Sequence, residues 1–166
     1  MFRVLFLFLP IFIFSNILKV GKNEKFKTIQ SAVASSQSGD SILVESGHYK
    51  EGNINITKPL TIIGIGRPVL DGEMKYEILS FRTNHIVLKG FKIINSGEDE
   101  VENIGAIRLY NSQYTTIEDN IFENNYFGIY IQRGYKCLIQ NNKITSTRAK
   151  SQEGSGDGIH AWVSQE

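Results

Sequence analysis

The sequence contains one cysteine, one tryptophan and three prolines, and its charges almost cancel. Because Cys137 is the only cysteine, no disulfide can form within the chain, and its stability has to come from packing. The 18 lysines and arginines face 17 aspartates and glutamates, so the net charge of +1 provides no basic surface for nucleic acid. The 166 residues suffice for about one domain, and we expect no nucleic acid partner.

A long apolar run occurs only at the N-terminus. Residues 1–20 contain one early cation, Arg3, and then an apolar stretch over residues 4–14. This stretch is shorter than the roughly 20 residues that cross a bilayer, and its position after a cation is typical of a secretory signal peptide. We predict that residues 1–20 are a signal peptide, cleaved after Ser15 or retained as an uncleaved anchor.

Short β-rich runs separated by glycine, asparagine and aspartate dominate the chain from Ser41 onward. Before them, residues 26–37 place apolar side chains at Ile29 and Val33, a spacing typical of one face of a helix. Thr28 stands where an N-cap would accept a backbone hydrogen bond. We therefore predict one short helix that begins near Thr28, followed by strands.

The β-rich part repeats with a period of about 22 residues, most clearly between the segments that begin at Ala106 and Gly128. With loops of different length between coils, one register aligns three columns: Ile62, Leu88, Ile117 and Ile139; Gly64, Gly90, Asp119 and Asn141; and Ile93, Phe122 and Ile144. Such a repeat is typical of a parallel β-helix. We predict this all-β fold over residues 24–166, with the helix capping the open first coil, and expect further coils beyond residue 166.

One corner of the solenoid is predicted to be polar. Asn95 and Asn124 occupy equivalent positions in consecutive coils, and so do Asn120 and Asn142 at another position. Ser146 follows Asn124 at its position in the next coil. Amide side chains stacked in this way can bond to one another, so we expect a hydrogen-bonded ladder at the Asn95 corner.

Alternation along the first strand of each later coil sorts its side chains into two sets. The set predicted to point inward comprises Ile107, Ile129, Ile159, Leu109, Ile131 and Ala161. The residues between them form two outward columns, which are Arg108, Tyr130 and His160, and Tyr110, Gln132 and Trp162. Because large aromatic residues on an outer surface are enriched at binding sites, we predict that these six residues form a binding face. Packing from coil to coil and coverage by further coils stay open as alternatives.

Candidate metal ligands are sparse. Cys137 shares an inward column with Leu60, Ile86 and Thr115, which favours a buried thiol. The three histidines lie on different coils, at positions 48, 85 and 160. A copper site needs several thiolate, thioether or imidazole ligands together. The sequence shows no such set, and His160 and Cys137 are only weak candidates for a metal.

Candidate catalytic carboxylates do not form a recognisable pair. Asp71, Glu73 and Glu77 lie close in sequence, but no pattern makes two of them face each other as polysaccharide-cleaving enzymes require. The acidic segment 97–103 is more typical of a solvated loop than of a cation site. We therefore predict no catalytic residue in this chain.

Two stretches resemble known proteins. Residues 26–72 resemble the N-terminal coil of pectin-lyase-like right-handed β-helices, which implies a fold and little else. A second likeness is more specific, because it resembles the NosD pattern N-x-F-G-I-Y followed by G-[ND]-G-I-H-x-W. The matching residues are Asn125, Phe127, Gly128, Ile129 and Tyr130, then Gly156, Asp157, Gly158, Ile159, His160 and Trp162. Ala161 departs from the larger aliphatic residue common at its position.

The NosD resemblance implies an exported, periplasmic maturation protein of denitrification. Members of that family work with an ABC-type transporter and a copper chaperone to supply the copper-sulfide centre of nitrous oxide reductase, and copper is the cofactor that the resemblance implies. Since no ligand set is visible here, we predict a non-enzymatic docking platform, peripheral to the membrane at most. The alternatives are a secreted polysaccharide lyase, hydrolase or epimerase, and a phage or adhesin spike that would form trimers.

Overall fold

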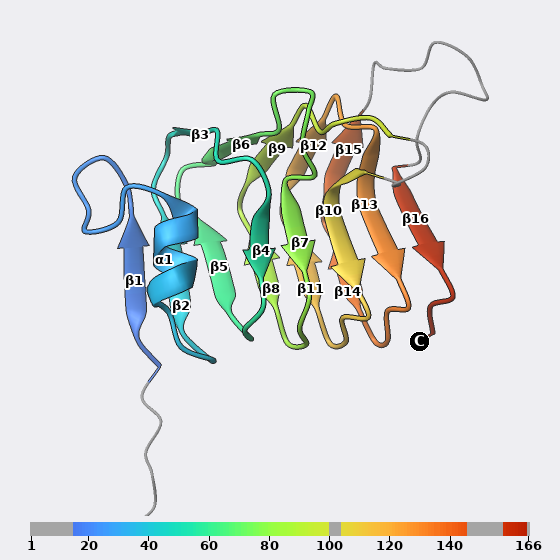
Figure 1. Ribbon diagram of the computed structural model, residues 1–166, viewed down its shortest axis with the longest axis horizontal. Coiled ribbons are helices and arrows are strands. Elements are labelled where there is room, and N and C mark those ends of the chain that lie inside the picture. Colours follow the sequence, from blue (N-terminus) through green and yellow to red (C-terminus); the bar gives the residue numbers. More distant parts are fainter. Residues whose placement is uncertain (1–14, 100–103, 146–157, 166) are drawn as a thin grey trace, which may run out of the picture.

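The computed structural model describes residues 15–99, 104–145 and 158–165. It confirms the predicted right-handed parallel β-helix, in which the chain coils through three parallel sheets (Figure 1). Successive coils pair in register, so each sheet runs along the solenoid axis. Within the described residues, no helix is long and apolar enough to cross a membrane.

The three sheets are called A, B and C. Sheet A contains β1 (Ile17–Val20), β2 (Ser41–Val44), β5 (Thr61–Gly64), β8 (Val87–Lys89), β11 (Thr116–Glu118) and β14 (Leu138–Gln140). Sheet B contains β3 (His48–Tyr49), β6 (Val69–Asp71), β9 (Lys92–Ile94), β12 (Ile121–Glu123) and β15 (Lys143–Thr145). Sheet C contains β4 (Ile54–Ile56), β7 (Leu79–Phe81), β10 (Gly105–Tyr110), β13 (Phe127–Gln132) and β16 (Ile159–Trp162).

The core consists of columns of like residues from successive coils. In sheet A the inward column is Leu18, Ile42, Ile62, Leu88, Ile117 and Ile139. In sheet B it includes Leu70, Ile93, Phe122 and Ile144. Both apolar columns predicted from the repeat are therefore confirmed. Alternation places these side chains inside because every second residue of a strand faces the same side.

Helix α1 (Ile29–Ser35) begins where the sequence predicts. The Thr28 side chain accepts a hydrogen bond from the backbone N–H of Ser31, which confirms the N-cap. The helix buries Ile29, Ala32 and Val33 and contacts β1, β2 and β4. It lies next to β4, the end strand of sheet C, and covers that end of the apolar interior (Figure 1).

Strand β1 differs from the expected domain boundary. The sequence-based division assigns Ile17–Val20 to the leader and starts the solenoid at residue 24, whereas these residues pair with β2 as the first strand of sheet A. Leu18 and Val20 point inward and are buried, so the apolar run that resembles a leader continues into a core strand. Residues 1–14 lie outside the described residues, and the signal peptide stays a prediction.

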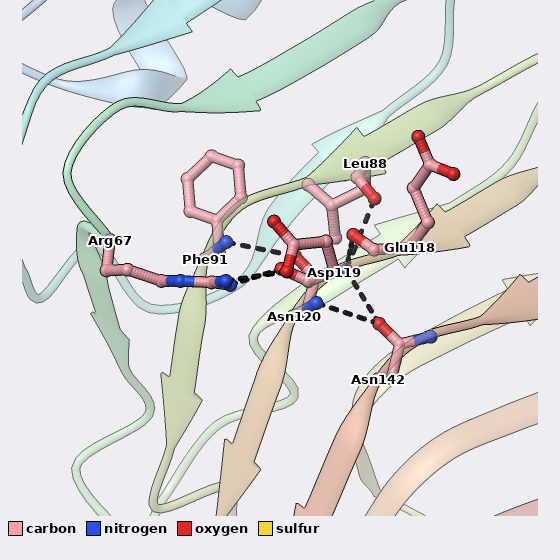
Figure 2. A network of polar contacts seen from close by, with 7 residues as sticks. All are labelled: Arg67, Leu88, Phe91, Glu118, Asp119, Asn120 and Asn142. Atoms are coloured by element: carbon pink, nitrogen blue, oxygen red, sulfur yellow. Dashed lines mark hydrogen bonds and ion pairs between the residues drawn. The ribbon is translucent and has the colours of Figure 1, made fainter.

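An asparagine at the corner between sheets A and B bonds backbone groups of two coils (Figure 2). Asn120 is 1% exposed, and its Oδ1 accepts a hydrogen bond from the Phe91 N–H at 3.0 Å. Its Nδ2 donates to the carbonyls of Leu88 and Glu118 at 3.2 and 2.9 Å. Asn142, one coil further, accepts from the Asn120 N–H through Oδ1 at 3.0 Å. The two side chains satisfy buried backbone groups that the turn leaves without strand partners.

The outer side of the corners also carries polar ladders. Asn124 donates to Asn95 Oδ1 at 2.7 Å, and Asn95 donates to Asp71 Oδ1 at 3.1 Å, which confirms the predicted pairing of the two asparagines. Both asparagines have φ near +56°, at 57° and 55°, a conformation that asparagine tolerates better than most residues. Ser146, expected next in this ladder, lies outside the described residues.

Replacing Asn120 by alanine should strongly destabilise the solenoid. The change removes the partner of a buried N–H and of two buried carbonyls, so we expect a loss of about 2 to 4 kcal/mol in the free energy of unfolding. Urea unfolding followed by circular dichroism measures this loss. Gln140→Ala is the control, because its exposed side chain bonds only Glu118 among the described residues; equal losses in the two variants would contradict the assigned role.

Candidate functional site

The outer face of sheet C carries all six residues of the predicted binding face. Arg108, Tyr130 and His160 are register partners in consecutive strands, and so are Tyr110, Gln132 and Trp162. The structure therefore places them in the two predicted columns. Strands β7 and β4 continue the face toward the N-terminus, with Ser80 opposite Arg108.

The guanidinium groups of two arginines lie over the ring of one tyrosine at the centre of this face. The guanidinium carbon of Arg82 lies 3.6 Å from the ring centre of Tyr110, and that of Arg108 lies 4.5 Å from it. Arg108 also lies 5.0 Å from the ring centre of Tyr130 and donates to Gln132 Oε1 at 3.0 Å. Cations near aromatic faces gain about 0.5–2 kcal/mol each. The contacts hold both guanidinium groups in fixed positions over the sheet.

The next part of the face is a small aromatic cluster. Tyr130 and His160 are stacked with ring centres 5.0 Å apart and planes 13° apart. Phe127 packs edge-on against both rings, and Tyr126 packs against Phe127. Tyr130 is only 6% exposed although it points away from the solenoid interior. Packing between coils, one of the alternatives from the sequence, therefore accounts for Tyr130.

Trp162 is different, because 46% of it is exposed. Arg133 lies 5.7 Å from its ring centre. The face thus combines a packed aromatic centre with an accessible tryptophan at one end. An exposed tryptophan beside an arginine is a common feature of binding surfaces.

A partly buried carboxylate, that of Glu77, lines the same cavity as the two central arginines. Glu77 precedes β7, and both of its carboxylate oxygens accept from the Tyr110 hydroxyl at 3.2 Å. Ser80 also donates to this carboxylate through its hydroxyl, and Asn53 donates at 3.4 Å. The surrounding cavity of about 270 Å³ is lined by Asn53, Glu77, Ser80, Arg82, Ile104, Arg108 and Tyr110.

Burial raises the pKa of Glu77 above its ordinary value, although the Ser80 hydrogen bond and the charges of Arg108 and Arg82 oppose the shift. Burial, together with the negative charge of Glu77, also raises the pKa of Tyr110. The Tyr110 hydroxyl thus stays protonated and donates a hydrogen bond to the carboxylate. Glu77 is a carboxyl group that gains a proton more readily than a solvated glutamate.

Sequence reasoning named Glu77 only as one of three neighbouring carboxylates and did not place it on this face, and it missed Arg82. Glu77 reaches Tyr110 across 33 residues, and the length of the connecting loop hides this proximity. Arg82 follows β7 and stands one coil before Tyr110, because Phe81 is the register partner of Leu109. Continuing the two outward columns one coil upstream would have found Arg82; nothing in the repeat would have found Glu77.

The weak metal candidates do not come together. Cys137 packs against the core, and its Sγ lies 3.5 Å from the carbonyl oxygen of Ser112. His160 is stacked on Tyr130 in a different sheet. Among the residues that the structure describes, no three His, Cys, Asp or Glu side chains are grouped to hold a metal ion. These residues therefore do not fit a copper site of several soft ligands.

A contact between a histidine and an aspartate, which the sequence did not predict, links neighbouring strands of sheet B. His48 Nε2 lies 2.8 Å from Asp71 Oδ2, and Asp71 is 7% exposed. Burial alone would raise the pKa of Asp71, but hydrogen bonds from the Glu73 N–H, Asn95 and His48 lower it overall. Asp71 is thus a charged structural residue, which ends the ladder of Asn95 and Asn124.

Comparison with protein-family models agrees with the fold. The family model for the right handed beta helix region matches residues 15–166. A crystal structure of the pectin methylesterase from Aspergillus niger, in penultimately deglycosylated form, is similar with 16% identity and a TM-score of 0.43, covering 88% of this chain and 67% of that chain. The deglycosylated form of that enzyme gives 18% identity and a TM-score of 0.34 over the same shares. Comparison with curated proteins gives no match.

Glu77→Gln should stabilise the protein at neutral pH and not in acid. A raised pKa means that the folded state binds the proton more tightly than the unfolded state, so ionised Glu77 lowers stability at high pH. This penalty disappears as the pH falls below the ordinary glutamate pKa of about 4.3. Thermal unfolding at about pH 7.5 and about pH 4 measures the difference, with Glu73→Gln as an exposed control. A gain of the same size at both pH values would contradict the assigned cause.

Tyr130→Ala and Trp162→Ala should differ in stability. Tyr130 is buried among Phe127 and His160, so its truncation should lower the free energy of unfolding by about 3 kcal/mol. Trp162 is half-exposed, and its truncation should lower it by about 1 kcal/mol or less. Chemical denaturation of both variants measures the two losses. Equal losses would mean that Trp162 is as much a packing residue as Tyr130.

Proposed function

The chain belongs to the right-handed β-helix family, and from this premise we propose that it is a non-enzymatic docking platform in the assembly of the copper-sulfide centre of nitrous oxide reductase. One observation carries the proposal. Residues that match the NosD pattern, Phe127, Tyr130, His160 and Trp162, lie together on one face of sheet C, although they come from two separate stretches of sequence.

The glycines of the pattern have a physical role in building this face. A Cβ atom on Gly128 would lie 2.5 Å from the carbonyl oxygen of Gly158, closer than side chains tolerate. The close approach brings β13 and β16 into register, which stacks His160 on Tyr130. The NosD-like glycines and aromatics thus support one feature, an ordered aromatic face.

The composition of the face favours binding over chemistry. Tyrosine, tryptophan and arginine are the residue types most enriched among those that dominate protein–protein affinity. They stand here on strands whose neighbours fix them, so little side-chain freedom is lost when a partner binds. We propose a copper chaperone or the reductase as the protein that docks, next to an ABC-type transporter in the periplasm. Copper is then cargo carried by the partners.

A carbohydrate-active enzyme is the second candidate, and Glu77 is the observation that favours it. A carboxyl group with a raised pKa that lines a cavity is the kind of group that acts as a general acid. Glycoside hydrolysis uses a second carboxylate on the other side of the bond. Among the described residues, Glu77 is the one acidic side chain that lines this cavity. The docking platform therefore ranks first.

Deleting the gene in its host should leave nitrous oxide reductase with its electron-entry copper site filled and its copper-sulfide centre absent. Copper per reductase subunit and reductase activity measure this outcome. Complementation with Trp162→Ala should restore only part of the activity, because the exposed tryptophan contacts the partner. Cys137→Ser, at a thiol packed against the core, should restore nearly all of it. A fully loaded, active reductase in the deletion strain would refute the proposed role.

A further inference from the structure

We infer that the region of sheet C around Arg82, Tyr110 and Arg108 binds the carboxylate groups of an acidic segment of the partner protein. This inference rests on the proposed docking function and names the chemistry of the partner. Three features of the structure carry it: the orientation of the guanidinium groups, the carboxylate already present at the site, and the covered faces of the aromatic rings.

Arg82 is held so that it can accept a carboxylate. One face of its guanidinium lies on the Tyr110 ring at 3.6 Å, while the residue as a whole is exposed. Within the described residues its side chain donates one hydrogen bond, from Nε to Asn55 Oδ1 at 3.2 Å. A guanidinium stacked in this way presents its remaining N–H groups at its edge, where they match the two oxygens of a carboxylate.

The site already accommodates one carboxylate of the chain itself. Glu77 is bound there by the hydroxyl groups of Tyr110 and Ser80, close to the positive charges of Arg108 and Arg82. This arrangement shows that the local groups are complementary to a carboxylate. The same negative charge weakens the attraction of Arg82 and Arg108 for an external acid, because like charges repel at short range.

The covered ring faces favour an acidic peptide over an acidic sugar. A sugar ring binds an aromatic side chain by lying flat on an open face of the ring. Here Arg82 and Arg108 lie 3.6 and 4.5 Å from the centre of the Tyr110 ring. His160 stacks on Tyr130, which is almost fully buried. Guanidinium edges are thus more accessible than ring faces along this part of sheet C.

Arg133 extends the same chemistry toward the end of the face. Its guanidinium lies 5.7 Å from the ring centre of the half-exposed Trp162. Arg82, Arg108 and Arg133 thus each accompany an aromatic ring on different coils of the face. Consecutive coils are about 4.8 Å apart, and every second side chain of an extended peptide points the same way. An acidic peptide that runs along the solenoid axis would therefore place alternate side chains near these arginines.

Fluorescence anisotropy with a labelled oligoglutamate peptide and the full chain tests the inference. We expect Arg82→Gln to weaken peptide binding about tenfold, and Arg82→Lys, which keeps the charge and loses the planar fork, to weaken it less. Glu77→Gln should strengthen binding, because it removes the competing negative charge and keeps a side chain of the same shape. Arg67→Gln is the matched control, since it removes an equal charge at the corner where Arg67 pairs with Asp119.

Two results would overturn the inference. One is oligoglutamate binding that Arg82→Gln and Arg67→Gln weaken equally, which would indicate unspecific attraction. The other is tighter binding of oligogalacturonate than of oligoglutamate, or its cleavage in a reaction that Glu77→Gln abolishes, which would identify a carbohydrate site. The two proposals can also fail separately. If oligoglutamate binding by the purified protein depends on Arg82 but the reductase of the deletion strain is fully loaded, the acid-binding site is supported and only the maturation role is refuted.

Discussion

The register between coils is the constraint on which the rest of this structure depends. Each residue has an equivalent about 4.8 Å away in the next coil, so a side chain must suit two neighbours as well as its own strand. Leucine and isoleucine meet this condition in the inward column of sheet A, from Leu18 to Ile139. At the turns, the hydrogen bonds between strands stop. There the side chains of Asn120 and Asn142 form hydrogen bonds with backbone N–H and C=O groups that have no partner in a neighbouring strand. Apolar columns thus maintain the register between coils within the strands, and asparagine side chains maintain it at the turns.

Register explains which parts could be predicted from the sequence. A period of about 22 residues determines the columns, and therefore the stack of Tyr130 and His160, because it concerns only residues at equivalent positions. Strand β1 escaped prediction because its apolar residues come soon after the N-terminal apolar run and were assigned with it to the leader. Glu77 and the pairing of His48 with Asp71 escaped because they connect different positions of different coils. Such contacts depend on the path of the loops, which vary in length.

The register between coils also divides the residues on the outer face of sheet C into a buried aromatic cluster and exposed residues at its margins. A tyrosine placed outside the coil is expected to be exposed, yet Tyr130 is buried because Phe127 and His160 of neighbouring positions cover it. Stacking between coils therefore removes aromatic area from solvent on the outside of the solenoid as well as inside. The residues left to contact a partner are those at the margins of this cluster, Trp162 at one side and Arg82 at the other. Rigidity of the cluster is what fixes their positions.

Two opposing effects act on the carboxylate of Glu77. Arg82 and Arg108 both lie over the Tyr110 ring and repel each other, and the nearby negative charge of Glu77 reduces this repulsion. Burial disfavours the same carboxylate, so its pKa is raised although two cations and a serine hydroxyl oppose the shift. The negative charge of Glu77 therefore comes at the cost of burying a carboxylate. A carboxylate of the partner approaches from the solvent side and supplies negative charge to the arginines without this cost. An acidic ligand relieves the repulsion that Glu77 compensates only in part.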